Sequence, residues 1–277
     1  MKKVLFATTA LIATAGVASA DVTVGGYGYL GVNFDGSANT TTVSHATRLT
    51  FSGSVETGSG ISFTASSRIT ISDNNDDGQL GHNKITMSSG GLTLAVGATH
   101  GAMKTTARIA TFHGFNDGGF YYTAGGSGVD NNVSTHNDSG NNVLISYSAG
   151  DFKVAASADV AGTTQELAAS YTFNSFTIAA GVDSSAGTRF MVGAKYNGGN
   201  WNVGLGTNSN SDIVLTAGYD ISDATSIGFG VDAASGGTIN AVGLQVKHDL
   251  GGANLIGAVG QVGGNNTVAS LGVMFSF

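Results

Sequence analysis

The chain has 277 residues, with no cysteine, no proline, 44 glycines and a formal net charge of −7. The lack of cysteine excludes a disulfide framework, and the acidic balance argues against a nucleic-acid partner, because phosphate binding requires a basic face. Proline breaks strand ladders because it has no backbone N–H, so its absence is typical of a chain that is almost entirely paired strand.

The first twenty residues predict an export signal. Lys2 and Lys3 precede an apolar stretch from Val4 to Val17, and Ala18-Ser19-Ala20 has the A-x-A cleavage pattern. We therefore expect a signal peptide over residues 1–20 and a mature domain over residues 21–277; a membrane anchor is the alternative. Removal of the two lysines leaves 11 − 2 = 9 basic residues against 18 acidic ones, a formal charge of −9.

The mature chain alternates apolar and polar residues with the period of a β-strand. Between Ser44 and Thr57, the apolar face carries Leu49, Phe51, Gly53 and Val55, while Arg48 and the hydroxyl residues occupy the other face. After Ala20 no apolar run approaches the roughly 18 residues of a transmembrane helix.

Sixteen segments share this alternation, and most run 8–13 residues, close to the roughly 9–11 residues of a tilted membrane strand. In chain order they are Val22–Phe34, His45–Glu56, Gly60–Ser72, Gly81–Ser88, Gly91–Thr99, Asn141–Ala149, Asp151–Val160, Gln165–Phe173, Ser175–Asp183, Thr188–Tyr196, Asn200–Gly206, Asp212–Asp220, Thr225–Asp232, Thr238–His248, Gly252–Gly260 and Thr267–Phe277. Tight turns at one side alternate with longer, polar connections at the other, which is the arrangement of a membrane barrel. The predicted tight turns are Gly58-Ser59, Gly90-Gly91, Gly150-Asp151, Asn174-Ser175, Gly198-Gly199 and Asp249-Leu250.

The polar face is too polar for a packed core. Lys153, Asp159, Glu166 and Asp183 share it, and buried charges without partners are costly, so this face must contact water. We therefore predict an all-β protein, a transmembrane antiparallel β-barrel of 16 strands with a wet interior. Aromatic residues near strand ends are candidates for the interfacial girdles. They are Tyr27, Tyr147, Tyr171, Phe173, Tyr196, Trp201, Tyr219, Phe275 and Phe277.

The two ends of the mature chain resemble the Gram-negative porin family. The start is D-V-T-V-G-G-Y-G-Y-L-G-V, and the end alternates Leu271, Val273, Phe275 and a terminal Phe277. The resemblance, which is strongest to porins of alphaproteobacteria such as the purple phototrophs, implies a homotrimer surrounded by outer-membrane lipid. It also implies that Phe277 is read by the barrel-assembly machinery, that a long third external loop folds into each barrel, and that the pore passes small hydrophilic solutes without catalysis.

One connection, His100 to Gly140, is far longer than the others and lies where the family has its constriction loop. Structureless connections beyond about 12–15 residues are usually functional or disordered. We expect this one to lie inside the barrel, with a helical turn or two within Met103–Ala110; an external flap is the alternative.

Three basic residues occupy lumen-facing positions on consecutive predicted strands: Arg48, Arg68 and Lys84. The family resemblance implies that acids of the constriction loop oppose them, and the candidates are Asp117, Asp130 and Asp138. Such an arrangement gives a transverse field that separates ions by sign. Lys104 and Arg108 depart from this picture, because they make the loop less acidic. The mature charge favours weak cation selectivity, although the basic cluster opposes it locally.

The segment Asp73-Asn74-Asn75-Asp76-Asp77-Gly78 contains the first half of a calcium loop, with Asp73, Asn75 and Asp77 as candidate ligands. Lys84 stands where an EF-hand has its bidentate glutamate, so the motif is not an EF-hand. A solvated acidic turn is the interpretation we favour, and we expect no required cofactor.

Three other functions are weighed against a diffusion pore. An enzyme lacks support, because the six histidines are scattered and no G-x-S-x-G motif occurs. A secreted adhesin built as a β-solenoid requires a short fixed repeat, which the chain does not have. A substrate-specific channel remains open, since Phe112, Phe115, Phe120, Tyr121 and Tyr122 could line an aromatic path.

Overall fold

The computed structural model describes residues 21–72, 78, 80–110, 134, 142–162, 164–184, 187–234, 237–263 and 265–277. These residues form sixteen strands and one short helix, as the sequence predicted. No helix among them is long and apolar enough to cross a bilayer. The strands are β1 (Asp21–Asp35), β2 (Thr40–Glu56), β3 (Ser62–Ser72), β4 (Leu80–Ser89), β5 (Leu92–Gly97), β6 (Asn142–Ala149), β7 (Phe152–Asp159), β8 (Gln165–Phe173), β9 (Phe176–Asp183), β10 (Phe190–Asn197), β11 (Trp201–Asn208), β12 (Ile213–Asp220), β13 (Thr225–Ala233), β14 (Ile239–Asp249), β15 (Ala253–Val262) and β16 (Asn266–Ser276), and the helix is η1 (Met103–Ala107).

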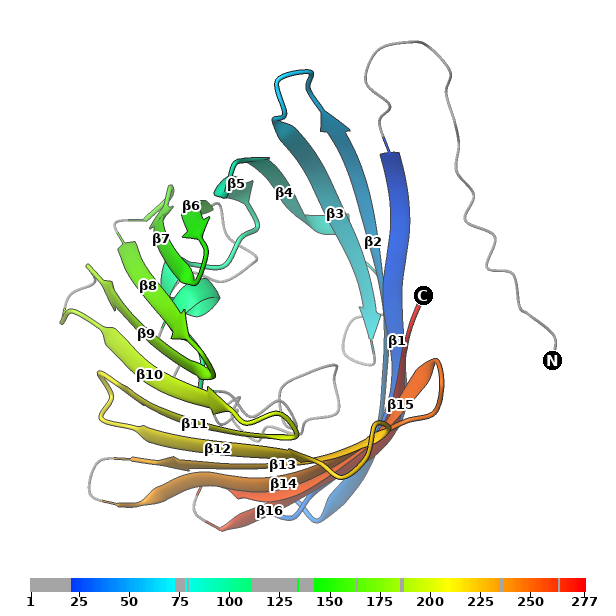
Figure 1. The fold of residues 1–277 in the computed structure, drawn as a ribbon. Coiled ribbons are helices and arrows are strands. Elements are labelled where there is room, and N and C mark those ends of the chain that lie inside the picture. The colour runs from blue at the N-terminus through cyan, green and yellow to red at the C-terminus, as the bar shows by residue number, and fades with distance from the viewer. Residues whose placement is uncertain are drawn as a thin grey trace.

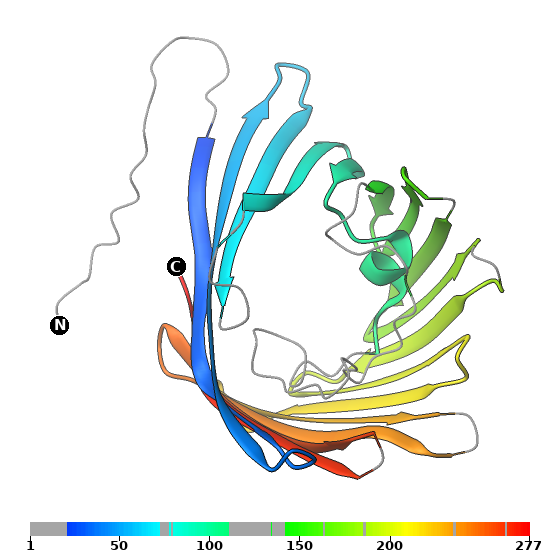
Figure 2. The ribbon, with the colours of Figure 1, turned by 180° about the vertical axis from the view of Figure 1, so that it is seen from behind.

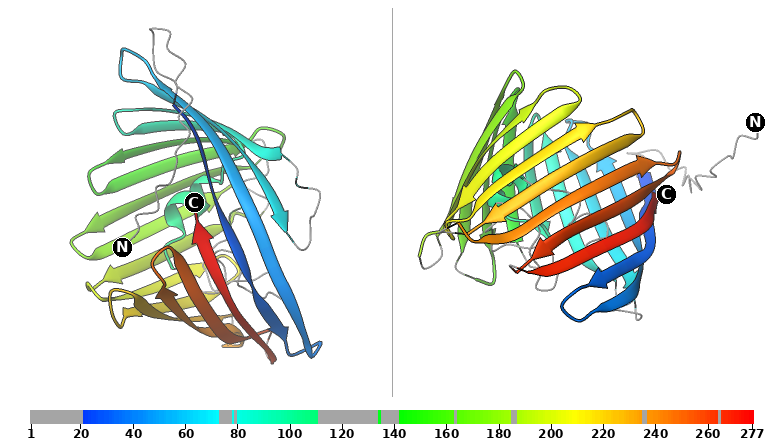
Figure 3. Two further views of the ribbon diagram at one scale, coloured as in Figure 1. Left: turned by 90° about the vertical axis from the view of Figure 1, so that its right-hand side faces the viewer. Right: turned by 90° about the horizontal axis from the view of Figure 1, so that it is seen from below.

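The strands close into one ring (Figure 1). Each strand pairs antiparallel with its neighbours in the sequence, and β1 pairs with β16 from Tyr27↔Ser276 to Asp35↔Val268. Closure leaves no open edge, so the backbone groups of the strands pair within the wall, as a structure without water around it requires. Figure 3 shows that the strands are tilted against the axis of the ring.

Burial follows the predicted alternation. On β9, Phe176, Ile178 and Val182 are exposed on the outside of the ring, while the intervening Ala179 and Asp183 are buried on the inside. The same period of two recurs on the other strands, with large apolar side chains directed outward. The outside is therefore an apolar band and the inside a polar wall.

The six predicted tight turns all fall between consecutive strands at one end of the barrel. At Gly90-Gly91 both central residues have positive φ, 54° and 87°, which is the conformation of a two-residue hairpin turn and is easily adopted by glycine. The start of β1 and the C-terminal residue also lie at this end, where Gly26 and Phe277 exchange two backbone hydrogen bonds of 2.8 and 3.0 Å.

Strand limits differ from the prediction at the opposite end. β2 begins at Thr40, five residues before the predicted His45, because Thr40 still pairs with Asp35 at the tip of β1. β15 extends to Val262 because that residue pairs with Asn266 of β16. β5 is shorter than predicted and ends at Gly97, where φ is +101°.

The aromatic girdle is present as a row on the outside, near the tight-turn end. Ring centroids lie 6.1 Å apart between Tyr171 and Phe173, 5.5 Å between Phe173 and Phe176, 4.6 Å between Phe176 and Tyr196, and 4.8 Å between Tyr196 and Trp201. The assignment of Tyr27 to this girdle is wrong, because Tyr27 pairs with Arg48 and lies on the lumen side beneath its guanidinium.

Candidate functional site

Arg48, Arg68 and Lys84 lie together on the inner wall formed by β2, β3 and β4. All three line a single cavity of about 630 Å³, and all are half-buried. Thr50, two residues after Arg48, pairs with Arg68, and Ser66, two residues before Arg68, pairs with Lys84. The three basic residues are therefore diagonal neighbours on adjacent strands. The predicted adjacency is confirmed, and we call these three residues the basic wall.

Arg48 is held by two contacts. Its Nε donates a 3.0 Å hydrogen bond to Thr70 Oγ1 on β3, and its guanidinium carbon lies 5.0 Å from the centre of the Tyr27 ring on β1. Such cation–π contacts stabilise a cation more strongly where water is partly excluded. The guanidinium is therefore fixed in place, and its two terminal nitrogens donate to no other residue that the structure describes.

Arg68 is positioned by His82 through an irregularity in the sheet. Ser66 pairs with Lys84 and Arg68 pairs with Gly81, so Ser67 alone faces His82 and Asn83. This β-bulge puts His82 at φ +55° and directs its imidazole to the lumen cavity. Arg68 Nη2 lies 3.0 Å from His82 Nε2. A guanidinium can only donate, so in this contact Nε2 of His82 is the acceptor.

The chain leaves the wall directly after β5. Ala98 donates its N–H to the Asn83 carbonyl at 2.8 Å, and Asn142 Nδ2 donates to the Thr99 carbonyl at 2.7 Å. The bulge at His82 and the turn at Gly97 are thus adjacent, and together they direct residues 98–110 into the ring. Figure 2 shows η1 inside the barrel, against the wall opposite β2 and β3.

Two backbone N–H groups at the start of η1 are bound by inner-wall side chains. Ala102 donates to Ser157 Oγ on β7 at 2.8 Å, and Met103 donates to Glu166 Oε2 on β8 at 2.9 Å. The first N–H groups of a helix have no partner within it, and a carboxylate there is also favoured by the helix dipole. At the other end of η1, Lys153 Nζ donates to the Thr105 carbonyl at 3.0 Å, where a cation is favoured.

Small residues allow η1 to pack closely on the wall. Met103 and Ala107 are fully buried in a cluster with Ala168 and Ala179, and Gly181 lies beneath them. A Cβ at Gly181 would lie 2.9 Å from Met103 Cγ and 3.2 Å from Ala107 Cβ. Further along, Ala110 is buried in a second cluster with Val214 and Val268, so the segment crosses the inner wall from β6 towards β12.

Several predicted residues lie outside the described part of the chain. They are the loop acids Asp117, Asp130 and Asp138, and the candidate calcium ligands Asp73, Asn75 and Asp77. Their roles stay predictions, as does the inward fold of the connection beyond residue 110, apart from Ser134. Among the described residues, no group of three or more histidine or acidic side chains could hold a metal ion.

Comparison with known proteins identifies the family. The sequence profile of Gram-negative porins matches residues 7–276. The chain belongs to the Gram-negative porin family. Among solved structures, a triple mutant of the porin from Rhodopseudomonas blastica has a TM-score of 0.77 at 20% identity, over 92% of this chain and 100% of that one. Two further variants of that porin, at 23% and 22% identity, cover the same shares with TM-scores of 0.76. At these identities the likeness shows the fold. No curated protein matches the chain.

Family and fold give the function at a general level. The porin is a pore of the Gram-negative outer membrane through which small hydrophilic solutes diffuse, and it is not an enzyme. The adhesin alternative is thereby excluded. The apolar outside of the barrel is the lipid-facing surface, and the polar inside is the channel wall.

Sequence reasoning gave no structural role to His82, Glu166 and Gly181, which shape the interior of the porin, and it assigned Tyr27 to the wrong face. Strand parity already placed Glu166 in the lumen, and the run of small inward residues Ala168, Ala179 and Gly181 was a readable sign of close packing against that wall. The same parity separates Tyr27 from the outward Val22 and Val24.

Proposed function

We propose that the basic wall is one side of the narrowest part of the porin's channel, and that the connection after β5 forms the other side. One observation carries this proposal: Thr99, His100 and Thr105 of that connection line the same cavity as Arg48, Arg68 and Lys84. A solute that passes through this cavity meets both surfaces. The packing of η1 against β7–β10 supports a fixed, rather than a freely moving, opposite side.

We further propose that Asp117, Asp130 and Asp138 oppose the basic wall, and that the pore is weakly cation-selective. The mature formal charge of −9 supports an excess of cations at the mouths. Within the constriction, cations follow the acidic side and anions follow the basic wall, so both signs pass.

Reversal potentials in a KCl gradient across planar bilayers test this proposal. The wild-type porin should show a small preference for potassium, and Arg48→Gln, Arg68→Gln and Lys84→Gln should each increase it. Lys247→Gln is the control for loss of one positive charge elsewhere in the pore, since Lys247 lies on β14, outside the cavity, and its effect should be smaller. A clear chloride preference of the wild type contradicts weak cation selectivity, and variants that behave like the control place the basic wall outside the conduction path.

The assembly is proposed to be a homotrimer, which rests on the family resemblance. Heat-modifiable migration of the detergent-solubilised protein tests it, together with channel closure in three equal steps. A single closing step per inserted unit and migration as a monomer before heating contradict it.

The predicted processing and assembly signals remain proposals. The A-x-A pattern at Ala18-Ser19-Ala20 supports cleavage after Ala20, and the mass of the mature protein tests it. Phe277 is proposed as the assembly signal. Its deletion should reduce the amount of porin in the outer membrane while purified, denatured protein still refolds in detergent.

For the calcium prediction, calorimetry with Asp73→Asn, Asn75→Ala and Asp77→Asn against the wild type is the test.

A further inference from the structure

We propose that the cavity beside the basic wall is a binding subsite for small oxyanions, namely a phosphate or carboxylate group carried by a hydrophilic solute. The solute would pause there during its passage through the pore. This inference rests on the proposed function, because it requires that the cavity lies on the conduction path.

The charges that line the cavity have one sign. Arg48, Arg68 and Lys84 line it, and no aspartate or glutamate does so among the residues that the structure describes. Within that part of the chain, Arg48 and Lys84 form no ion pair with a carboxylate, although both are half-buried. Half-buried cations are less screened than exposed ones, so their summed field favours an anion in the cavity.

One of the cations is held ready for a bidentate contact. Thr70 and Tyr27 fix Arg48, and among the described residues only its Nε takes part in a hydrogen bond. Arg68 adds a second positive charge to the lining and lies against His82, in a bulge whose backbone has positive φ. A guanidinium offers donors in a planar fork that matches a carboxylate or phosphate, and fixing it beforehand reduces the entropy lost on binding.

The remaining lining favours an oxyanion over chloride. Hydroxyl groups from β2, β3, β4 and β5 line the cavity, and they can donate to oxygens that the guanidinium groups do not reach. They belong to Thr50, Ser66, Thr86 and Thr93. At about 630 Å³, the cavity falls within the range of roughly 300–1,000 Å³ that is usual for small-molecule sites. It can therefore admit a small solute that carries the anionic group.

The test uses the complete porin in planar bilayers with KCl on both sides. Inorganic phosphate should reduce the KCl conductance of the wild type with a saturable dose dependence, glucose 6-phosphate should do so as well, and glucose should not. Raising the KCl concentration should weaken the effect of phosphate, because salt screens charge–charge attraction. This last measurement needs no variant.

Charge-removing variants locate the effect. Arg48→Gln, Arg68→Gln and Lys84→Gln should each weaken the apparent affinity for phosphate roughly tenfold, as expected for the loss of a charge-assisted hydrogen bond. Lys247→Gln should leave it unchanged. Heat-modifiable migration confirms that each variant is assembled.

Three outcomes overturn the proposal. If phosphate has no saturable effect while the same variants still shift the reversal potential, the basic wall lies on the conduction path but is not a binding site. If the variants change neither quantity, the proposed constriction fails as well. If glucose reduces the conductance as strongly as phosphate does, the cavity selects by size or hydroxyl contacts and not by charge.

Discussion

The carboxylate of Glu166 on β8 accepts the backbone N–H of Met103 at 2.9 Å, and with its second oxygen it accepts the hydroxyl of Ser134 at 2.7 Å. Met103 lies near the start of the connection between β5 and β6, and Ser134 lies near its end. A single buried side chain, 3% exposed, therefore holds both arms of this connection to the barrel wall.

Removal of this carboxylate should make the channel unstable without dismantling the barrel. Glu166→Ala leaves the Met103 N–H and the Ser134 hydroxyl without their acceptor, which costs about 1–3 kcal/mol where the groups stay buried. We expect partial closures and increased current noise in single-channel recordings, because η1 is no longer held at its first turn. Glu166→Gln should show a weaker effect, since its amide oxygen can still accept one of the two bonds.

Glu56→Gln is the control for the loss of one acidic charge. Glu56 lies on β2 near the tight-turn end and is exposed, and its side chain has no hydrogen bond in the described structure. Quiet, wild-type-like currents from Glu166→Ala would show that the segment is held by packing alone.

A larger side chain at position 181 should push η1 away from the wall. Gly181→Leu introduces atoms into space that Met103 and Ala107 already fill, and such overpacking usually costs about 1–3 kcal/mol. The helix can yield only towards the lumen, so we expect a lower single-channel conductance. Gly53→Leu is the matched control, because a Cβ at Gly53 has no atom within 4 Å. Equal conductance in the two variants would contradict the docking of η1 on β9.

The inward and outward faces of the strands could be predicted because apolar and polar residues alternate along the sequence with a period of two. This alternation on consecutive strands was sufficient to predict that Arg48, Arg68 and Lys84 lie on one wall. The contact of Glu166 with Met103 was not predictable in this way, because the two residues are 63 positions apart and meet only where η1 packs on the inner wall. The bulge at His82 was not predictable from strand parity either, because the alternation along one strand does not show where its neighbour has an extra residue.

The backbone at His82 offers a comparison that separates strain from side-chain function. A non-glycine residue in the left-handed region costs about 1–2 kcal/mol, whereas glycine adopts it readily. His82→Ala and His82→Gly both lose the contact with Arg68. The φ of +55° at this position is strained for alanine but not for glycine. The glycine variant should therefore be more stable than the alanine variant by about 1 kcal/mol in urea unfolding from lipid vesicles. Identical unfolding midpoints would mean that the bulge relaxes when the imidazole is lost.

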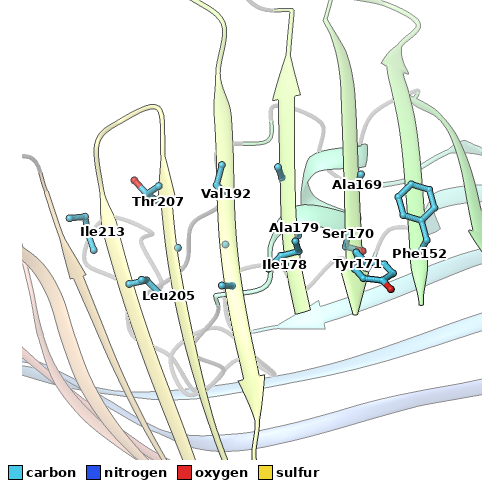
Figure 4. Close-up of a pocket in the computed structure, with 14 residues that line it drawn as sticks. Phe152, Ala169, Ser170, Tyr171, Ile178, Ala179, Val192, Leu205, Thr207 and Ile213 are labelled. Carbon is cyan, nitrogen blue, oxygen red and sulfur yellow. The ribbon is translucent and has the colours of Figure 1, made fainter. Parts of the chain in front are cut away.

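The outside of the barrel provides the sharpest test of the alternating wall. Over β7–β12 the outer surface is hollowed, and the small side chain of Ala169 lies among larger ones, which include Ile178 and Leu205 (Figure 4). Ala180 also lines this hollow. The lining is apolar apart from three hydroxyl groups, those of Ser170, Tyr171 and Thr207, so an arginine placed there is surrounded mainly by lipid and apolar side chains. Arginine near the bilayer midplane destabilises outer-membrane barrels by about 2–4 kcal/mol.

Ala180→Arg should therefore lower the free energy of unfolding in lipid vesicles by about 2–4 kcal/mol, measured by equilibrium denaturation. Thr177→Arg is the matched control on the same strand, because Thr177 faces the water-filled lumen and pairs with Lys195. Its stability should stay close to that of the wild type, although the added lumen charge should shift the reversal potential towards chloride. The opposite order of the two stabilities would require that β9 presents its other face to the lipid.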